Sequence, residues 1–191
     1  MVNLLKNTTA LAMHIVKSYI GEDCIAIDAT CGNGHDTLAL MQGGCKSVYA
    51  FDIQKSAIDS TRELLTKNHV DLSNVKLIKD SHINMKSYVD SANIIMFNLG
   101  YLPGGDKSIA TDTSSTLPSV KTALSILREN GICSIAMYSG HLQGKLEKEA
   151  LLQMAKELDK SLFHVAYINF TNQPNNPPEL LLITKKERIK K

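Results

Sequence analysis

Short apolar runs alternate with longer amphipathic stretches along most of this chain, and no other feature limits its possible folds as strongly. Short apolar runs are typical of strands buried on both faces, whereas apolar positions that recur every three or four residues indicate helices. Strands that alternate with helices predict a doubly wound α/β fold, a mostly parallel sheet covered by helices on both faces. The expected strands are residues 24–28, 47–51, 75–79, 93–98, 132–138, 163–170 and 180–184. The expected helices lie near residues 35–41, 54–67, 114–128 and 144–159.

The two ends of the chain add a helix and a hairpin to this sheet. Thr8 or Thr9 can cap a first helix, and Gly21 is a residue type that commonly stops helices. Residues 171–179 separate the last two strands and are rich in Asn and Pro, with no helical period. This segment predicts an antiparallel C-terminal hairpin rather than another helical crossover, so that seven strands form one Rossmann-like sheet.

The length of 191 residues suits one domain over residues 1–191, with an N-terminal helix within residues 1–22 and a basic tail at residues 185–191. A formal net charge of +2 permits a nucleic-acid partner without demanding one. The four cysteines form no CxxC pair, so no metal site is expected. Neither a signal-peptide pattern nor a long apolar run is present, which predicts a cytoplasmic protein without a membrane span. The oligomeric state stays open, and a homodimer is one option.

The first expected strand leads directly into a turn that contains two glycines, within the segment AIDATCGNGHDT at residues 26–37. These glycines can take positive φ and let the backbone approach a ligand, and doubly wound sheets bind ligands at such turns. Tight packing alone is the alternative role for two glycines, but the acid that ends the strand can hold a cationic amino group and favours ligand binding. Cys31 in this turn is expected to be a small packing residue rather than a nucleophile. The expected cofactor-site residues here are Asp28, Cys31, Gly32, Asn33, Gly34 and Asp36.

A dinucleotide site also begins with a strand, glycines and a helix, so the details of the turn decide between cofactors. Thr37 occupies the position of the third glycine of a dinucleotide-binding turn, and Asp36 would repel a pyrophosphate at the helix N-terminus. S-adenosylmethionine carries no phosphate. Asp52 ends the second strand, where a carboxylate can accept hydrogen bonds from both ribose hydroxyls. The pattern therefore predicts S-adenosylmethionine as the cofactor, with Ile53 and Gln54 completing this part of its site.

Polar residues also follow the third strand, at the same carboxyl edge of the sheet. Asp80 can accept a hydrogen bond from an adenine amino group, and Ser81 and His82 come next in the chain. Asp80 or Ser81 can equally cap the short helix expected after them. We assign these three residues to the cofactor site with both roles open.

The fourth strand delivers an asparagine into a glycine-rich loop, in the segment NLGYLPGGDKS at residues 98–108. This segment resembles the Asn-Pro-Pro-Tyr element of amino-methylating enzymes. In that element the Asn oxygen accepts a hydrogen bond from the target amine and the aromatic ring packs on the base. Asn98 and Tyr101 keep the spacing of the element, whereas Leu99 and Gly100 replace its two prolines. Asn98, which also borders the cofactor site, and Tyr101 are therefore expected catalytic residues.

Five segments together resemble one bacterial family. They are DATCGNGHDT at 28–37, FDIQ at 51–54, NLGYLPGGDKS at 98–108, YSGH at 138–141 and NQPNNPP at 172–178. The family was first labelled rRNA methylases, and its better-defined members are MnmM-type tRNA 5-(aminomethyl)-2-thiouridine methyltransferases. The resemblance covers nearly the whole chain and implies a class I methyltransferase fold. It also implies methyl transfer to the aminomethyl nitrogen of the wobble uridine, with the tRNA anticodon stem-loop as the partner.

The remaining polar and aromatic residues of these segments suit the substrate side. His141 can accept the proton that the alkylammonium must lose, or it can be an ordinary hydrogen-bonded loop histidine. Single-stranded RNA calls for stacking rings and cations, and the basic tail can either contact phosphates or remain solvated. The expected substrate-binding residues are Tyr101, Gly104, Asp106, Lys107, Tyr138, His141, Asn172, Gln173 and Asn175. The rival hypotheses are methylation of rRNA or of a small-molecule amine, and a non-catalytic RNA-binding scaffold.

Overall fold

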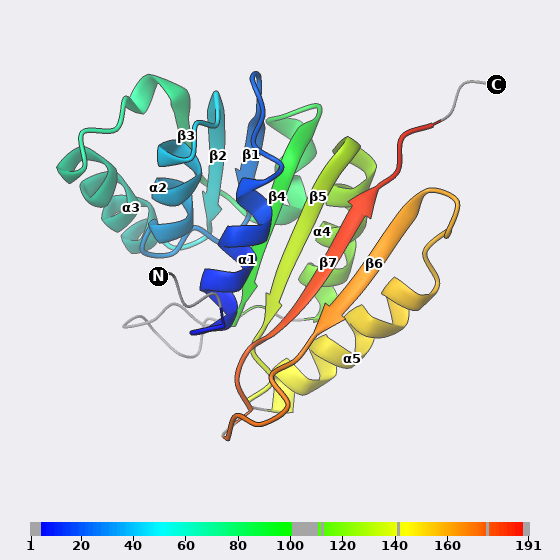
Figure 1. Cartoon of the computed structure of the whole chain (residues 1–191). Helices are drawn as coiled ribbons and strands as arrows, with labels where there is room; N and C mark the ends of the chain where they lie inside the picture. Colours follow the sequence, from blue (N-terminus) through cyan, green and yellow to red (C-terminus); the bar gives the residue numbers. More distant parts are fainter. Residues whose placement is uncertain (1–4, 101–110, 112, 141, 175, 189–191) are drawn as a thin grey trace.

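Seven strands form a single sheet in the order β3-β2-β1-β4-β5-β7-β6 (Figure 1). The computed structural model describes residues 5–100, 111, 113–140, 142–174 and 176–188. The strands are β1 (Ile25–Asp28), β2 (Ser47–Asp52), β3 (Val75–Lys79), β4 (Ala92–Leu99), β5 (Leu127–Met137), β6 (Phe163–Ile168) and β7 (Glu179–Lys185). The first five strands are mutually parallel, and β7 is inserted antiparallel between β5 and β6. The doubly wound sheet and its C-terminal hairpin are thus confirmed.

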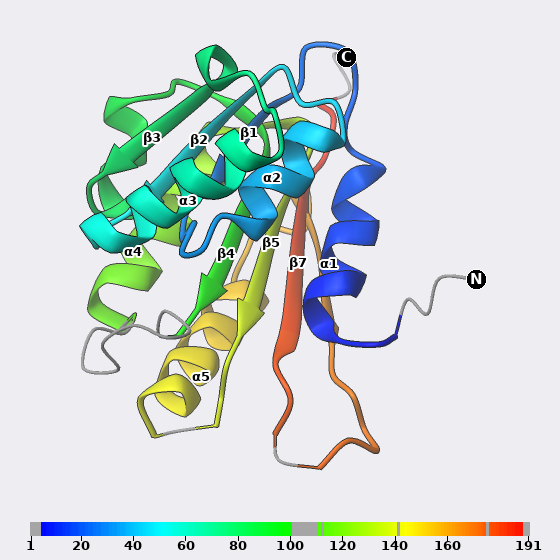
Figure 2. The same ribbon diagram turned by 90° about the vertical axis from the view of Figure 1, so that its left-hand side faces the viewer.

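The helices cover both faces of this sheet, as Figure 2 shows. They are α1 (Thr8–Lys17), α2 (His35–Gln42), α3 (Lys55–Lys67), α4 (Thr113–Ile126) and α5 (Leu142–Lys156), with short 3-10 helices η1 (Leu72–Asn74) and η2 (His82–Ser87). α4, α5 and η2 bury one face, around Phe97 and Leu151. α1 and α2 bury the other, around Val16 and Leu40, and α3 packs beside them through Ile58. Burial on both faces explains why the central strands are nearly continuous apolar runs.

The start of α1 differs from the sequence-based expectation. Asn7, rather than Thr8 or Thr9, caps the helix, and its Oδ1 accepts a hydrogen bond from Ala10 N at 2.8 Å. Thr8 is buried, and its hydroxyl donates to the carbonyl oxygen of Pro178 in the segment before β7. A tertiary contact therefore takes the hydroxyl that local sequence reasoning assigned to the cap, and it ties the N-terminal helix to the hairpin.

The end of α1 also comes earlier than Gly21. The helix stops at Lys17 because Ser18 donates hydrogen bonds from both its amide and its hydroxyl to Ile15 O, at 3.1 Å and 2.6 Å. A serine that bonds to the preceding turn competes with further helical hydrogen bonding. The glycine is therefore not needed as the helix stop.

β5 begins earlier than expected, at Leu127 instead of residue 132. Asn130 has a positive φ of 59°, and a Cβ on Gly131 would lie 2.7 Å from Asn93 O. The strand register shifts at this point, and Leu127 still pairs with Ala92. A local irregularity of this kind interrupts the strand pattern in the sequence without ending the strand.

The expected basic tail is partly built into the fold. Lys185 is the last residue of β7, and its Nζ donates to Leu127 O at 2.7 Å. The Nζ of Lys186 donates to Lys160 O at 2.6 Å. β7 ends at the edge of the sheet opposite the carboxyl ends of the parallel strands (Figure 1). The ammonium groups of both lysines therefore stabilise the edge of the sheet that lies away from the carboxyl ends of the parallel strands.

Candidate functional site

A pocket of about 620 Å³ lies at the carboxyl ends of β1, β2 and β4. We call it the transfer pocket. It is lined by the glycine turn after β1, the residues after β2 and β3, the end of β4, and Tyr138 after β5. Thr9 of α1 and Ser115 of α4 also belong to its lining. The sheet topology therefore brings segments from the ends of five strands, which are distant in the sequence, to one site, as expected for a doubly wound sheet.

The glycine turn has the conformation that its two glycines allow. Gly32 and Gly34 take positive φ of 51° and 84°, and the Gly34 amide donates to Cys31 O at 2.7 Å. A Cβ on Gly34 would lie only 2.8 Å from the Cα of Thr61 in α3. Any side chain at this position would therefore meet both backbone strain and a backbone clash. The turn thus packs closely against α3 at Gly34, while Gly32 and Asn33 line the pocket.

Asp52 fixes the turn to the end of β2. Its Oδ2 accepts a hydrogen bond from Gly32 N at 3.1 Å, and its Oδ1 accepts one from Gln54 N at 2.9 Å. A carboxylate has about four acceptor positions, so two remain for a ligand on the pocket side. Ile53 lies beside it, lines the pocket and is 54% exposed. A carboxylate that can accept from two neighbouring hydroxyls, next to an apolar surface, suits a ribose with its attached base.

Asp28 lies behind the pocket rather than on its lining. The side chain has no exposed surface, its Oδ2 accepts from the Thr37 hydroxyl at 2.6 Å, and its Oδ1 accepts from Thr30 N at 3.3 Å. Burial, together with the nearby charge of Asp36, raises the pKa of Asp28 to about 7. Thr37 therefore has a role that a third glycine could not have, because its hydroxyl pairs with a buried acid. The predicted contact of Asp28 with an amino group stays a prediction.

Cys31 follows the same pattern of burial. Its thiol is 5% exposed and packs with Ala50 and Ile58. Burial raises the pKa of this thiol, so the neutral form dominates and no thiolate is available for nucleophilic attack. This environment suits a packing role.

Asn98 meets Asp36 inside the transfer pocket. The Asn98 Nδ2 donates to Asp36 Oδ2 at 2.6 Å, and the Asn98 backbone N–H donates to the Thr30 hydroxyl at 2.7 Å. Asp36 is 8% exposed, and burial raises the pKa of its carboxyl above the ordinary value. Because the amide nitrogen points to a carboxylate, the amide oxygen of Asn98 is left as the acceptor for a ligand.

The residues after β3 divide between the pocket and the surface. Asp80 accepts hydrogen bonds from Tyr88 OH at 2.9 Å and Asn84 Nδ2 at 3.0 Å, and these partners lower its pKa. The carboxylate of Asp80 is thus held outside the pocket lining. Ser81 caps η2 through Ile83 N, as the capping alternative predicted, and Ser81 also lines the pocket. His82 lines the pocket too, and its Nδ1 lies 3.1 Å from Ala29 O.

The expected substrate-binding residues are only partly placed. Tyr138 follows β5, lines the transfer pocket and is 39% exposed. Asn172 and Gln173 are exposed in the segment between β6 and β7, at the same edge of the sheet but outside the pocket lining. The remaining expected residues, Tyr101, Gly104, Asp106, Lys107, His141 and Asn175, lie outside the described residues.

Eight residues of the pocket lining were not among the expected site residues: Thr9, Ala29, Thr30, His35, Leu99, Gly100, Thr111 and Ser115. Thr30 lies within the glycine-turn motif, so its proximity to the ligand could have been inferred from its neighbours. Thr9 and Thr111 reach the pocket only through tertiary packing, and nothing in their local sequence points to it.

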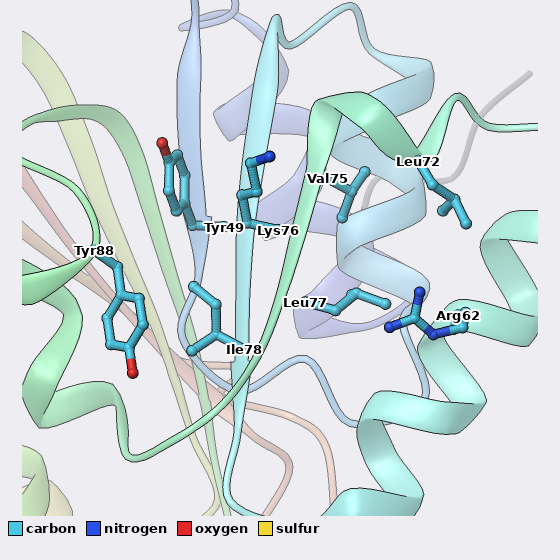
Figure 3. Close-up of a pocket in the computed structure, with 8 residues that line it drawn as sticks. All are labelled: Tyr49, Arg62, Leu72, Val75, Lys76, Leu77, Ile78 and Tyr88. Atoms are coloured by element: carbon cyan, nitrogen blue, oxygen red, sulfur yellow. The ribbon is translucent and has the colours of Figure 1, made fainter.

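A second pocket, of about 410 Å³, flanks the free edge strand β3 (Figure 3). Its lining includes Tyr49, Arg62, Lys76 and Tyr88, from β2, α3, β3 and the segment after η2. Tyr49 pairs with Lys76 in the strand register, well before the carboxyl ends of these strands. Its lining contains no carboxylate, so the transfer pocket is the better candidate for a catalytic site.

Within the described ranges, no group of three or more His, Cys, Asp or Glu side chains could hold a metal ion. The helices of the same ranges include none that is long and apolar enough to span a membrane.

A sheet in this order, with a glycine turn after β1 and an acid at the end of β2, defines a class I S-adenosylmethionine-dependent methyltransferase. Residues 48–184 match the family described as "Putative rRNA methylase". The chain is also 37% identical to the Arabidopsis thaliana protein named "tRNA (mnm(5)s(2)U34)-methyltransferase, chloroplastic", over 95% of this chain and 70% of that protein. The chain belongs to this rRNA methylase family, which confirms the resemblance carried by its motifs.

Two solved structures agree closely with this fold. The crystal structure of a "putative rRNA-methylase" from Clostridium thermocellum has a TM-score of 0.90 and 39% identity, covering 94% of this chain and 98% of that one. A "putative methyltransferase" of Streptococcus mutans, solved in complex with SAH, has a TM-score of 0.87 and 39% identity, covering 97% of this chain and 99% of that one.

Proposed function

We propose that this enzyme transfers a methyl group from S-adenosylmethionine to the aminomethyl nitrogen of 5-aminomethyl-2-thiouridine at the tRNA wobble position. The product is 5-methylaminomethyl-2-thiouridine. The observation that carries this proposal is the orientation of Asn98, whose Nδ2 donates to Asp36 at 2.6 Å inside the pocket. The amide oxygen then faces the substrate as a hydrogen-bond acceptor. Such an acceptor suits a nucleophile that carries N–H groups, as an amine does.

The described residues fit the proposed cofactor. Asp52 keeps acceptor capacity for the two ribose hydroxyls after its bonds to Gly32 and Gln54. Ile53 offers an apolar surface for the base, and Gly32 and Asn33 line the part of the pocket next to the turn. When bound, S-adenosylmethionine supplies a methyl group made electrophilic by its sulfonium centre.

The chain's own task is to align the amine and to exclude water. Asn98 Oδ1 accepts one N–H of the amine and so aims its lone pair. Asp36 holds the Asn98 amide in the orientation that this step requires. We keep Tyr101 as the residue that packs on the base and His141 as the acceptor of the ammonium proton, both as parts of this proposal.

Two observations support tRNA as the substrate. The Arabidopsis relative is named a tRNA methyltransferase, and aromatic and amide side chains lie at one edge of the sheet. Tyr138 offers a ring for stacking beside the pocket, and Asn172 and Gln173 offer donors and acceptors at the same edge. In this proposal Lys107 supplies the cation for a phosphate of the anticodon loop.

The test is methylation of tRNA that carries 5-aminomethyl-2-thiouridine, followed by nucleoside digestion and mass spectrometry. We expect the methylated nucleoside with the wild-type protein and its near absence with Asn98→Ala. Matched reactions contain the same tRNA without the aminomethyl group, rRNA, or benzylamine as a free amine. Methylation of rRNA or benzylamine in preference to the tRNA would contradict the proposed substrate.

A further inference from the structure

A buried acid on α5 is connected by hydrogen bonds to the backbone next to Asn98. Glu147 is 4% exposed, its Oε1 accepts from the Thr116 hydroxyl at 2.5 Å, and its Oε2 accepts from the Thr111 hydroxyl at 3.1 Å. A buried carboxylate is costly unless hydrogen bonds replace its hydration. These two hydroxyls supply two such bonds, and they connect the acid to two different segments of the substrate side.

Thr111 is in turn hydrogen-bonded to Gly100. The Thr111 hydroxyl accepts a hydrogen bond from Gly100 N at 2.9 Å, and the Thr111 amide donates to Gly100 O at 3.0 Å. Both residues line the transfer pocket, and Gly100 has a φ of 151°, which side-chain-bearing residues rarely adopt. The chain leaves this pair at Gly100 and returns at Thr111, and the positions between them include Tyr101 and Lys107.

The backbone after β4 is thus held on two sides. Thr30 accepts from the amide of Asn98, and Thr111 bonds to both the amide and the carbonyl of Gly100. The side-chain amide of Asn98 must stay within a fraction of an ångström of its productive position. Residues that hold the backbone around a catalytic group maintain such a geometry.

We propose that Glu147 is a positioning residue for methyl transfer. It acts through Thr111 to hold the backbone at Gly100, and this backbone in turn holds the side-chain amide of Asn98 beside the substrate. This inference rests on the proposed N-methylation. Glu147 touches neither substrate nor cofactor in this account. Its loss should therefore lower turnover while leaving the affinity for S-adenosylmethionine unchanged.

Conservative variants test each link. Glu147→Gln keeps the side-chain shape, but its NH₂ group cannot accept from a hydroxyl, so one of the two hydroxyls loses its charged acceptor. Thr111→Val keeps the shape and removes the hydroxyl, and Thr111→Ser restores it. Thr122→Val makes the same change as Thr111→Val on the exposed side of α4, where the Thr122 hydroxyl donates to Pro118 O at 3.0 Å, and serves as the matched control.

We expect Glu147→Gln and Thr111→Val each to lower kcat by roughly tenfold, the effect of one ordinary hydrogen bond. Thr111→Ser and Thr122→Val should stay within about twofold of wild type, and calorimetric affinity for S-adenosylmethionine should also stay within about twofold for all variants. The double variant Glu147→Gln/Thr111→Val should be no slower than the slower single variant, because both changes interrupt the same chain of hydrogen bonds from Glu147 through Thr111 to Gly100.

Hydrogen exchange measured by NMR gives a readout independent of the substrate. The Gly100 amide should exchange faster in Glu147→Gln and in Thr111→Val than in wild type, and at the wild-type rate in Thr111→Ser. If wild type methylates another amine, kcat is measured on that amine, so failure of the tRNA assignment leaves this test intact. A Glu147→Gln protein with a lower melting temperature but unchanged kcat and unchanged Gly100 exchange would overturn the proposal. Should Glu147→Gln not fold, equal kcat and equal exchange in Thr111→Val and Thr111→Ser would overturn it as well.

Discussion

Replacing Asp36 by asparagine removes one negative charge from the transfer pocket while keeping the shape of the side chain. In the wild type, Asp36 Oδ2 accepts from Asn98 Nδ2 at 2.6 Å, and the side chain is only 8% exposed. A hydrogen bond to a charged group contributes about 1.5–3 kcal/mol, and a neutral one about 0.5–1.5 kcal/mol. The difference of about 1–1.5 kcal/mol predicts a kcat that is about five- to thirteenfold lower in Asp36→Asn.

The same bond predicts a pH dependence whose sign follows from the pKa of Asp36. Burial raises this pKa, although the hydrogen bond from Asn98 and the charge of the neighbouring His35 lower it. The ionised carboxylate is the form that holds Asn98. Acidification therefore lowers kcat as the pH falls through a pKa above the ordinary value for aspartate, and Asp36→Asn should lose this contribution and keep only the acidic limb that protonation of the amine and its proton acceptor causes.

Single-turnover methyl transfer from labelled S-adenosylmethionine, measured across this pH range, checks both effects. Asp23→Asn is the matched control, because Asp23 is an exposed acid paired with Lys46 at 2.6 Å. A wild-type rate and pH profile in Asp36→Asn would show that the charge of Asp36 does not hold Asn98 in place. A large loss of cofactor affinity with an unchanged rate would instead make Asp36 a cofactor ligand, as the sequence pattern alone predicted.

Three further outcomes are expected. Asp52→Ala should weaken calorimetric binding of S-adenosylmethionine by about 1.5–3 kcal/mol, since it removes a charged acceptor from the proposed ribose site; unchanged affinity would exclude that role. The free energy of unfolding should fall as the pH rises from about 4 to 7, because the pKa of Asp28 is raised from 3.8 to about 7 in the folded protein and the folded state binds the proton more tightly. Denaturant titrations of Asp28→Asn should show a weaker pH dependence, and an identical one would contradict the burial argument. Lys107→Ala should reduce the log-log salt slope of tRNA binding by about 0.7 without changing cofactor affinity; a lower melting temperature with the wild-type slope would remove Lys107 from the RNA site.

Periodicity and turn chemistry were sufficient to predict the layers of this fold. Buried parallel strands are apolar throughout, and the segment without helical period at residues 171–179 correctly indicated the antiparallel hairpin. The glycine turn was also predictable, because its two glycines take positive φ of 51° and 84°, which favours this residue type. Local sequence carries this information because the constraints are themselves local.

Tertiary packing decided the features that the sequence did not reveal. The Thr8 hydroxyl bonds to Pro178 rather than capping α1, and Lys185 bonds across the sheet to Leu127 rather than joining a solvated tail. Asp28 ends its strand as expected, yet it is turned behind the pocket toward Thr37. In each case the competing partner lies far away in the sequence or on another element.

The support for Asn98 was the least accessible part of the site to sequence reasoning. Glu147 and Thr111 are separated by 36 positions, and neither belongs to a recognisable motif. An acid on a helix is expected to be exposed to solvent, and only the structure shows that Glu147 is buried.

The proposed methyl acceptor is the aminomethyl nitrogen, and tandem mass spectrometry with deuteromethyl-labelled S-adenosylmethionine locates the atom that receives the methyl group. After reaction with tRNA that carries 5-aminomethyl-2-thiouridine, fragmentation of the labelled nucleoside should release the deuterated methyl group together with the aminomethyl nitrogen. Label found on the ribose, on the ring of the base or on the sulfur would contradict the account.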